Sequence, residues 1–138
     1  MTISVKAAVA AALLFSPALA PVLAPAPAFA TLTVNPTLTV HNRCGVEIII
    51  AIHYKGRNGW ETTPFVNVRA SERKEDVVSS DNSIFYYYAQ DLADKPKVRW
   101  AGDQNHKVNG KDYPMKKAAL TLDRQSNSYR LELSCPPR

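Results

Sequence analysis

The sequence predicts an all-β fold, an antiparallel β-sandwich of about eight strands that is closed by a disulfide. Apolar and polar residues mostly alternate, and turn residues recur about every eight to twelve positions, a pattern typical of sandwiches and barrels. The only two cysteines lie near the two ends of the segment that follows an N-terminal leader. No heptad pattern and no internal repeat competes with this interpretation.

Residues 1–30 have the composition of a secretory signal peptide. Lys6 is followed by an apolar stretch, and Ala28-Phe29-Ala30 has the small-x-small pattern that signal peptidase recognises. We expect cleavage after Ala30 rather than after Ala18-Leu19-Ala20, because Pro21 would then be the first mature residue. Prolines interrupt the apolar run, so a transmembrane helix is not expected. The sequence therefore predicts a periplasmic or secreted bacterial protein with one domain, residues 31–138, and no stable membrane insertion after cleavage.

Cys44 and Cys135 are expected to form a disulfide, because exported chains meet oxidising conditions in which paired thiols persist. Closing so long a loop stabilises a domain by about 4.6 kcal/mol in the chain-entropy model. A catalytic or metal-binding thiol is the alternative, and it would require a CxxC pair or nearby ligands, which the sequence lacks.

The first half of the domain contains four expected strands. Isoleucines at positions 48, 50 and 52 predict that the even-numbered face of the second strand is buried, and Pro64 predicts an edge position or a bulge in the third. Asn58-Gly59 supplies a hairpin turn. The expected strands are residues 38–41, 46–54, 60–68 and 77–79, with turns at residues 55–59, 70–76 and 80–83.

The second half contains four more expected strands. Ile84 to Ala89 is apolar or aromatic on both faces and belongs in the middle of a sheet, whereas Tyr129 to Leu133 alternates and should have one wet face. The other expected strands are residues 97–101, with Val98 and Trp100 inward, and residues 118–122. A single helical turn is expected within residues 91–96 and a loop at residues 102–110.

The net charge of the whole chain is +5, and one unit of it leaves with Lys6 of the leader. Basic residues are interspersed with acidic ones, as in the stretch from Ser71 to Asp76, and export removes the usual nucleic-acid targets. We expect no nucleic-acid binding and only a weak attraction to anionic surfaces.

Catalytic and metal-binding motifs are absent from the sequence. His41, His53 and His106 match no metal-ligand spacing, although Glu47 and His53 share a strand face by parity, and no G-x-S-x-G elbow occurs. Carboxylates at Asp91, Asp94 and Asp103 fall in expected loops. We therefore expect no cofactor, no metal and no enzyme. The enzymatic alternative is a small periplasmic hydrolase that uses His53 or His106 with a nearby carboxylate.

Aromatic residues are the better candidates for function. Exposed tyrosine and tryptophan rings make rigid, amphipathic contacts with protein or glycan partners. The expected contact face is the hairpin from Tyr54 to Trp60 with Tyr86 or Tyr88 beside it. Arg57 and Lys55 at its rim favour an anionic or glycan-like partner. The candidate binding residues are Tyr54, Arg57, Trp60, Tyr86 and Tyr88. In the alternative interpretation these rings fill the core.

Five short motifs occur in an order that resembles the bacterial domain-of-unknown-function (DUF) family 1036. They are His41-Asn42-Arg43-Cys44, Ala51-Ile52-His53-Tyr54, Trp60-Glu61-Thr62, Tyr86-Tyr87-Tyr88-Ala89 and Trp100-Ala101-Gly102. The resemblance covers residues 40–102 and implies a small exported module of unknown activity, with no catalytic residue to carry over.

Two departures from that family weaken the expectation that an exposed aromatic pair forms a binding surface here. Thr63-Pro64-Phe65 stands where the family tends to have Gly-Trp-Trp or Gly-Trp-Phe, and Arg69-Ala70-Ser71 replaces its Pro-Gly turn. The sequence thus predicts an exported module that binds an envelope or extracellular protein or glycan. A structural subunit of an envelope complex is a further alternative, and the sequence leaves the oligomeric state open.

Overall fold

The computed structural model describes residues 16–27 and 34–137, and it divides the chain into two units, residues 1–32 and 33–138. Residues 16–27 contain no helix or strand. The expected cleavage site after Ala30 lies outside the described residues. The parts of the chain that the structure describes contain no helix with the length and hydropathy of a membrane span.

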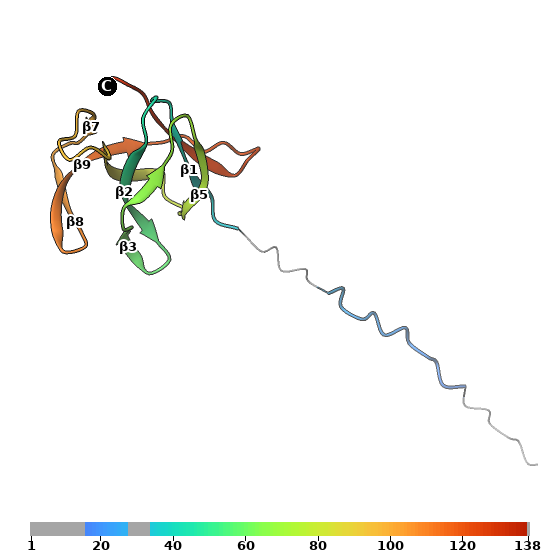
Figure 1. Ribbon diagram of the computed structural model, residues 1–138. Coiled ribbons are helices and arrows are strands. Elements are labelled where there is room, and N and C mark those ends of the chain that lie inside the picture. The colour runs from blue at the N-terminus through green and yellow to red at the C-terminus, as the bar shows by residue number, and fades with distance from the viewer. Residues whose placement is uncertain (1–15, 28–33, 138) are drawn as a thin grey trace, which may run out of the picture. The chain divides into compact units, whose positions relative to one another are not determined.

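The second unit is built from ten strands and, within residues 34–137, from no helix (Figure 1). The all-β prediction is therefore confirmed, with ten strands in place of about eight. The strands are β1 (Thr37–Asn42), β2 (Ile48–Gly56), β3 (Gly59–Thr62), β4 (Val66–Val68), β5 (Arg73–Ser79), β6 (Ile84–Asp91), β7 (Arg99–Trp100), β8 (Gln104–Val108), β9 (Lys111–Ala119) and β10 (Ser128–Leu133).

The strands form two sheets. The smaller sheet has the order β10-β1-β5, and the larger has the order β3-β2-β6-β9-β8, with β4 paired to β2 and β7 paired to β6. All pairs are antiparallel except β1 and β10, which run parallel. The first and last strands of the domain are thus neighbours in one sheet.

The main core lies between the two sheets and consists of alternate residues from their facing strands. Ile48, Ile50 and Ile52 are fully buried in it, as their even-numbered positions predict. Leu38 and Val40 of β1 face them from the smaller sheet, together with Leu131 and Leu133 of β10. Strand β6 lies between β2 and β9, which confirms the central position expected from its two apolar faces.

The expected disulfide between Cys44 and Cys135 is present. Cys44 follows β1 and Cys135 follows β10, so the bond joins the segments that leave two adjacent parallel strands. Cys44 is almost fully buried beside the core. The disulfide therefore ties the start of the domain to its end.

Two strands that are rich in polar residues, β8 and the first part of β5, were not expected from the sequence. Residues 102–110 were expected to form a loop, but Gln104–Val108 is strand β8, and a turn at Asn109 and Gly110, both with positive φ, connects it to β9. Residues 70–76 were expected to be a turn, but strand β5 begins at Arg73. Both strands lie at sheet edges. There, backbone hydrogen bonds to one neighbour hold a strand in place while most of its side chains face water, so no apolar alternation marks it in the sequence.

Two further differences have local causes. The expected strand at residues 60–68 is split around Pro64 into β3 and β4, because proline cannot donate to a ladder. No helical turn forms at residues 91–96, because the Asp91 carboxylate accepts hydrogen bonds from the N–H groups of Ala93, Lys97 and Val98. A side chain that satisfies backbone donors in this way favours a turn over a helix.

The larger sheet curls because β9 divides its pairing between two neighbours. Residues 111–115 pair with β8, and residues 116–119 pair with β6. The segment that follows β7 lies beside the first half of β9, where the Gly102 N–H donates to the carbonyl of Pro114. The β8–β9 hairpin therefore bends over the outer face of the sheet, away from the main core.

Candidate binding site

The outer face of the larger sheet carries a second hydrophobic cluster. Ala51 and Tyr88 lie opposite one another on β2 and β6, and Val108 and Met115 of the β8–β9 hairpin complete its buried part. Phe65, Tyr86 and Tyr113 pack around them. The curl of the sheet thus buries part of a face that a flat sheet would leave in water.

His53 and His106 come together across this curl. Their rings stack with centroids 3.7 Å apart and planes inclined by 16°. Strands β6 and β9 separate β2 from β8 in the sheet order, so a flat sheet would hold these strands about 14 Å apart. The contact therefore depends on the bend of the β8–β9 hairpin.

Trp60 and Tyr86 surround the same histidine. The indole of Trp60 stacks on His53 with centroids 5.1 Å apart and an angle of 11°. Tyr86, which pairs with His53 across β2 and β6, lies 5.9 Å from His53 and 5.2 Å from His106 between ring centroids. Four rings from four strands thus form one cluster, which we call the ring cluster.

The β2–β3 hairpin places Trp60 in the ring cluster. Gly56 pairs with Gly59 around a two-residue turn, and Gly59 has a φ of 113°, which favours glycine. This register sets Lys55 opposite Trp60, so the indole emerges on the odd-numbered face of β2 with His53. Trp60 keeps 47% of its surface exposed.

His53 is held in the neutral state by its surroundings. Burial, and then the adjacent His106 ring, lower the pKa of His53 from its ordinary value of 6.5. Its Nδ1 atom shares a 2.8 Å hydrogen bond with the hydroxyl of Thr62, the residue opposite it on β3. His106 Nε2 is buried and has no hydrogen-bond partner within the described residues. A neutral imidazole such as that of His53 can both donate and accept hydrogen bonds.

The ring cluster lines an open depression of about 420 Å³. Its lining residues are His53, Trp60, Tyr86, Gln104 and His106. None of these side chains carries a permanent charge, and all except Gln104 present a ring. The depression therefore offers ring faces together with one amide, two imidazoles, the Tyr86 hydroxyl and the Trp60 indole N–H as polar groups. This combination suits a neutral ligand that has apolar faces and hydroxyls.

The structure separates the five candidate binding residues. Trp60 and Tyr86 belong to the ring cluster, whereas Tyr88 is only 4% exposed in the second hydrophobic cluster. Tyr54 points to the opposite face of β2, where its hydroxyl donates to Glu61 and where it lines another cavity together with Arg57. Tyr54 is separated from His53 and Trp60 because even and odd positions of β2 face opposite sides of the sheet.

The search for similar proteins returned nothing that identifies the chain. No protein-family model, curated protein or solved structure matches it. The resemblance to DUF family 1036 stays an expectation that its short motifs carry.

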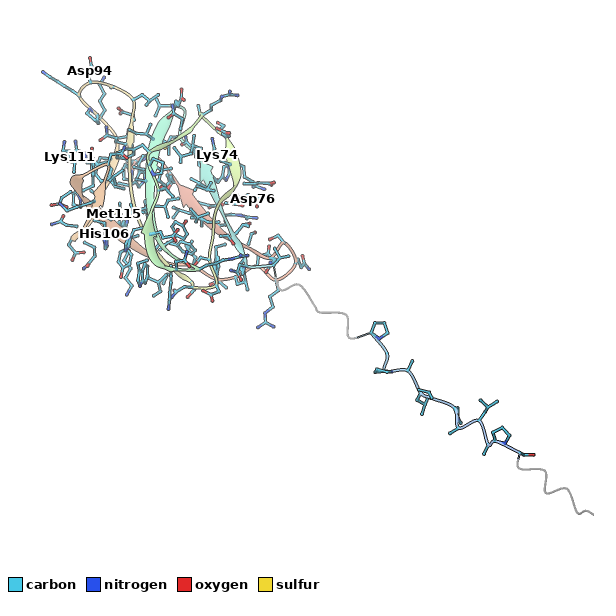
Figure 2. The ribbon with its side chains drawn as sticks, turned by 90° about the horizontal axis from the view of Figure 1, so that it is seen from below. Lys74, Asp76, Asp94, His106, Lys111 and Met115 are labelled. Atoms are coloured by element: carbon cyan, nitrogen blue, oxygen red, sulfur yellow. A yellow bond between two sulfur atoms is a disulfide. The ribbon has the colours of Figure 1, made fainter. Side chains whose placement is uncertain are left out.

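The hydrolase alternative requires a carboxylate that interacts with His53 or His106. Within residues 16–27 and 34–137, no carboxylate forms a hydrogen bond or ion pair with His53 or His106. Asp91 is occupied by backbone N–H groups, and Figure 2 shows Asp94 in a loop far from His106.

The stacked histidines do not form a metal centre. No group of three or more histidine, cysteine, aspartate or glutamate side chains in the described parts of the chain can hold a metal ion. An imidazole binds a metal in the plane of its ring at about 2 Å. Rings that stack nearly parallel at 3.7 Å do not converge on one ion.

Proposed function

We propose that this protein is an exported binding module whose ring cluster binds a carbohydrate chain. The observation that carries the proposal is the open, uncharged depression in which the exposed Trp60 is held against His53 and beside Tyr86. Sugar rings have apolar C–H faces that stack on indole and phenol rings, and their hydroxyls need polar groups at the edge. Gln104 and His106 supply such groups here.

Preorganisation supports this function. Trp60 is fixed by its stack on His53, and His53 is fixed by Thr62, so the aromatic surface exists before a ligand arrives. Rigid rings lose little conformational entropy on binding, which allows a small contact to contribute usable affinity. Arg57 lines the cavity on the other side of the hairpin and does not reach the ring cluster. Lys55 of β2 and Lys117 of β9 share the face of Trp60 and Tyr86 but do not line the depression.

The proposed location of the protein is the periplasm or the cell exterior. The signal-peptide composition of residues 1–30 and the DUF family 1036 resemblance support export. The disulfide between Cys44 and Cys135 agrees with an oxidising compartment.

Carbohydrate binding is tested with a glycan array that contains soluble and insoluble envelope polysaccharides. We expect retention of the wild-type protein and loss of at least about tenfold in affinity for Trp60→Ala, a cost of about 1.4 kcal/mol. Leu92→Ala is the matched control, because Leu92 is equally exposed at 49% and lies outside the ring cluster. Equal binding by wild type and Trp60→Ala would contradict the proposal, as would capture of a protein partner without any glycan.

A further inference from the structure

We propose that the His53–His106 stack is a pH-sensitive latch. The latch holds the β8–β9 hairpin against β2 while at least one ring is neutral, and it releases the hairpin when both rings are protonated. The opening follows from the protein alone. Only its effect on ligand affinity rests on the proposed carbohydrate binding.

The latch lies at a seam that backbone hydrogen bonds do not close. Strands β3 and β8 are the two edges of the larger sheet, and the curl brings them into contact without pairing them. Side chains hold this seam together. The stack of His53, on β2 next to the β3 edge, with His106 on β8 is the closest ring contact across it. His106 lies on β8 opposite Tyr113 of β9, on the hairpin that has to move (Figure 2). A change in this contact therefore acts directly on the seam.

The groups that face the stack oppose a second positive charge. Strand β2 contributes Lys55 to this face and β6 contributes Tyr86, while β3 contributes the uncharged Trp60 and Thr62. Strand β9 contributes Lys111, Tyr113 and Lys117, and the Lys111 ammonium lies over the Tyr113 ring. Glu61 lies on the opposite face with Tyr54. Within the described residues, the facing set thus contains three cations and no carboxylate to offset a doubly protonated stack.

One proton is compatible with the closed latch. A single imidazolium at His53 gains a cation–π contact with Trp60, and the neutral partner ring still stacks on it. Two imidazolium rings with centroids 3.7 Å apart repel at close range in a partly desolvated site. Separation of the rings relieves that repulsion, and bending the β8–β9 hairpin outward requires no loss of β3–β8 hydrogen bonds.

Ring-to-ring nuclear Overhauser effects (NOEs) measure the latch directly. The protein, expressed from its full-length sequence with the disulfide intact, is titrated by NMR from pH 8 to pH 4.5 without ligand. We expect NOEs between His53 and His106 at neutral pH and their loss once both rings titrate. The NOEs between Phe85 and Tyr129, whose rings pack 5.3 Å apart in the main core, should persist and report the intact fold.

Two variants separate a latch from a general response to acid. His106→Phe keeps a neutral ring on His53, so its ring NOEs should remain at pH 4.5, whereas His41→Gln lies outside the site and should behave like wild type. Persistence of the wild-type NOEs after both histidines are protonated would overturn the proposal. Loss of the Phe85–Tyr129 NOEs at the same pH would overturn it as well. Because the wild-type titration suffices, the test does not depend on whether His106→Phe folds.

The consequence for the ligand is tested separately with the glycan that the array identifies. Affinity should fall about tenfold from pH 7.5 to pH 5, as expected when the closed form drops to about a tenth of the population. His106→Phe should remove most of this dependence. Ring NOEs that respond to pH without any glycan binding would refute the carbohydrate proposal and leave the latch intact.

Discussion

Gly102 touches the backbone of Met115 so closely that a Cβ atom at position 102 would overlap the Met115 carbonyl and the Lys116 Cα. This contact lies where β9 exchanges β8 for β6 as its partner, and the Gly102 N–H donates to Pro114 there. The residue without a side chain therefore permits the approach on which the curl of the larger sheet depends.

Gly102→Ala should destabilise the domain by about 1–3 kcal/mol, because backbone atoms cannot yield as a flexible side chain can. Urea unfolding followed by circular dichroism measures the change. Gly45→Ala is the matched control, since a Cβ there has no atom within 4 Å and should change the stability little. Equal midpoints for the two variants would show that the strand bend does not need glycine.

Asn42→Ala should cost about 2–4 kcal/mol, because the fully buried amide connects three backbone carbonyls. Its Nδ2 atom donates to the carbonyls of Val46, Val68 and Arg69, and its Oδ1 atom accepts from the Cys44 N–H. Thermal unfolding of Asn42→Ala beside the exposed Asn67→Ala tests this role. A difference below about 0.5 kcal/mol between the two variants would contradict it.

Reduction of the Cys44–Cys135 disulfide should lower the free energy of unfolding by about 3–5 kcal/mol, since the bond closes a sequence separation of 91 residues. The Cys44→Ala/Cys135→Ala double variant should match the reduced protein in denaturant titrations. If neither treatment shifts the midpoint, the packing of β1 on β10 already provides the constraint that we assign to the bond.

His53 should make the domain less stable as the pH falls below 6.5. Burial and the His106 ring lower the pKa of His53, so just below 6.5 the unfolded chain binds a proton that the folded protein does not. Stability therefore decreases until the pH reaches the folded pKa, and the loss is then complete. Denaturant midpoints from pH 8 to pH 5 should fall for wild type and His41→Gln and stay flatter for His53→Phe. An identical slope in all three would exclude His53 as the source.

Asp91→Ala should destabilise the turn before β7 at neutral pH. Burial opposes ionisation of Asp91, but the N–H groups of Ala93, Lys97 and Val98 prevail and lower the pKa of the carboxyl below 3.8. This contribution is present above pH 3.8 and disappears as the pH falls through the folded pKa. The gap in thermal midpoint between wild type and Asp91→Ala should thus narrow in acid. Asp94→Ala, a nearby exposed carboxylate, should show no such gap at either pH.

The strands with alternating apolar residues could be predicted from the sequence, because burying one face of a strand requires apolar residues at every second position. Ile48, Ile50 and Ile52 and the last strand follow this pattern, and the central position of β6 follows from its two apolar faces. The polar first part of β5 and the whole of β8 lack this pattern, because backbone pairing at sheet edges tolerates polar side chains on both faces. The partner of β5 is β1, which is distant in sequence, whereas β8 pairs with the adjacent β9 across a two-residue turn.

The candidate site, too, could be predicted from the sequence only in part. Trp60 and Tyr86 were identified from residue type, and the two-residue turn at residues 57–58 sets the register that places Trp60 with His53. That register contained enough information to separate Tyr54 from the others by parity. Gln104 was not a candidate, because it falls in a stretch expected to be a loop.

The sequence by itself determined the all-β class, the buried face of β2 and the disulfide pairing, because these depend on local periodicity and on a choice among only two cysteines. Tertiary structure alone decided the parallel β1–β10 pair, the curl of the larger sheet and the contact of His53 with His106. These depend on the Gly102 approach and on partners that are far apart along the chain, and such proximity arises only when the sheet closes.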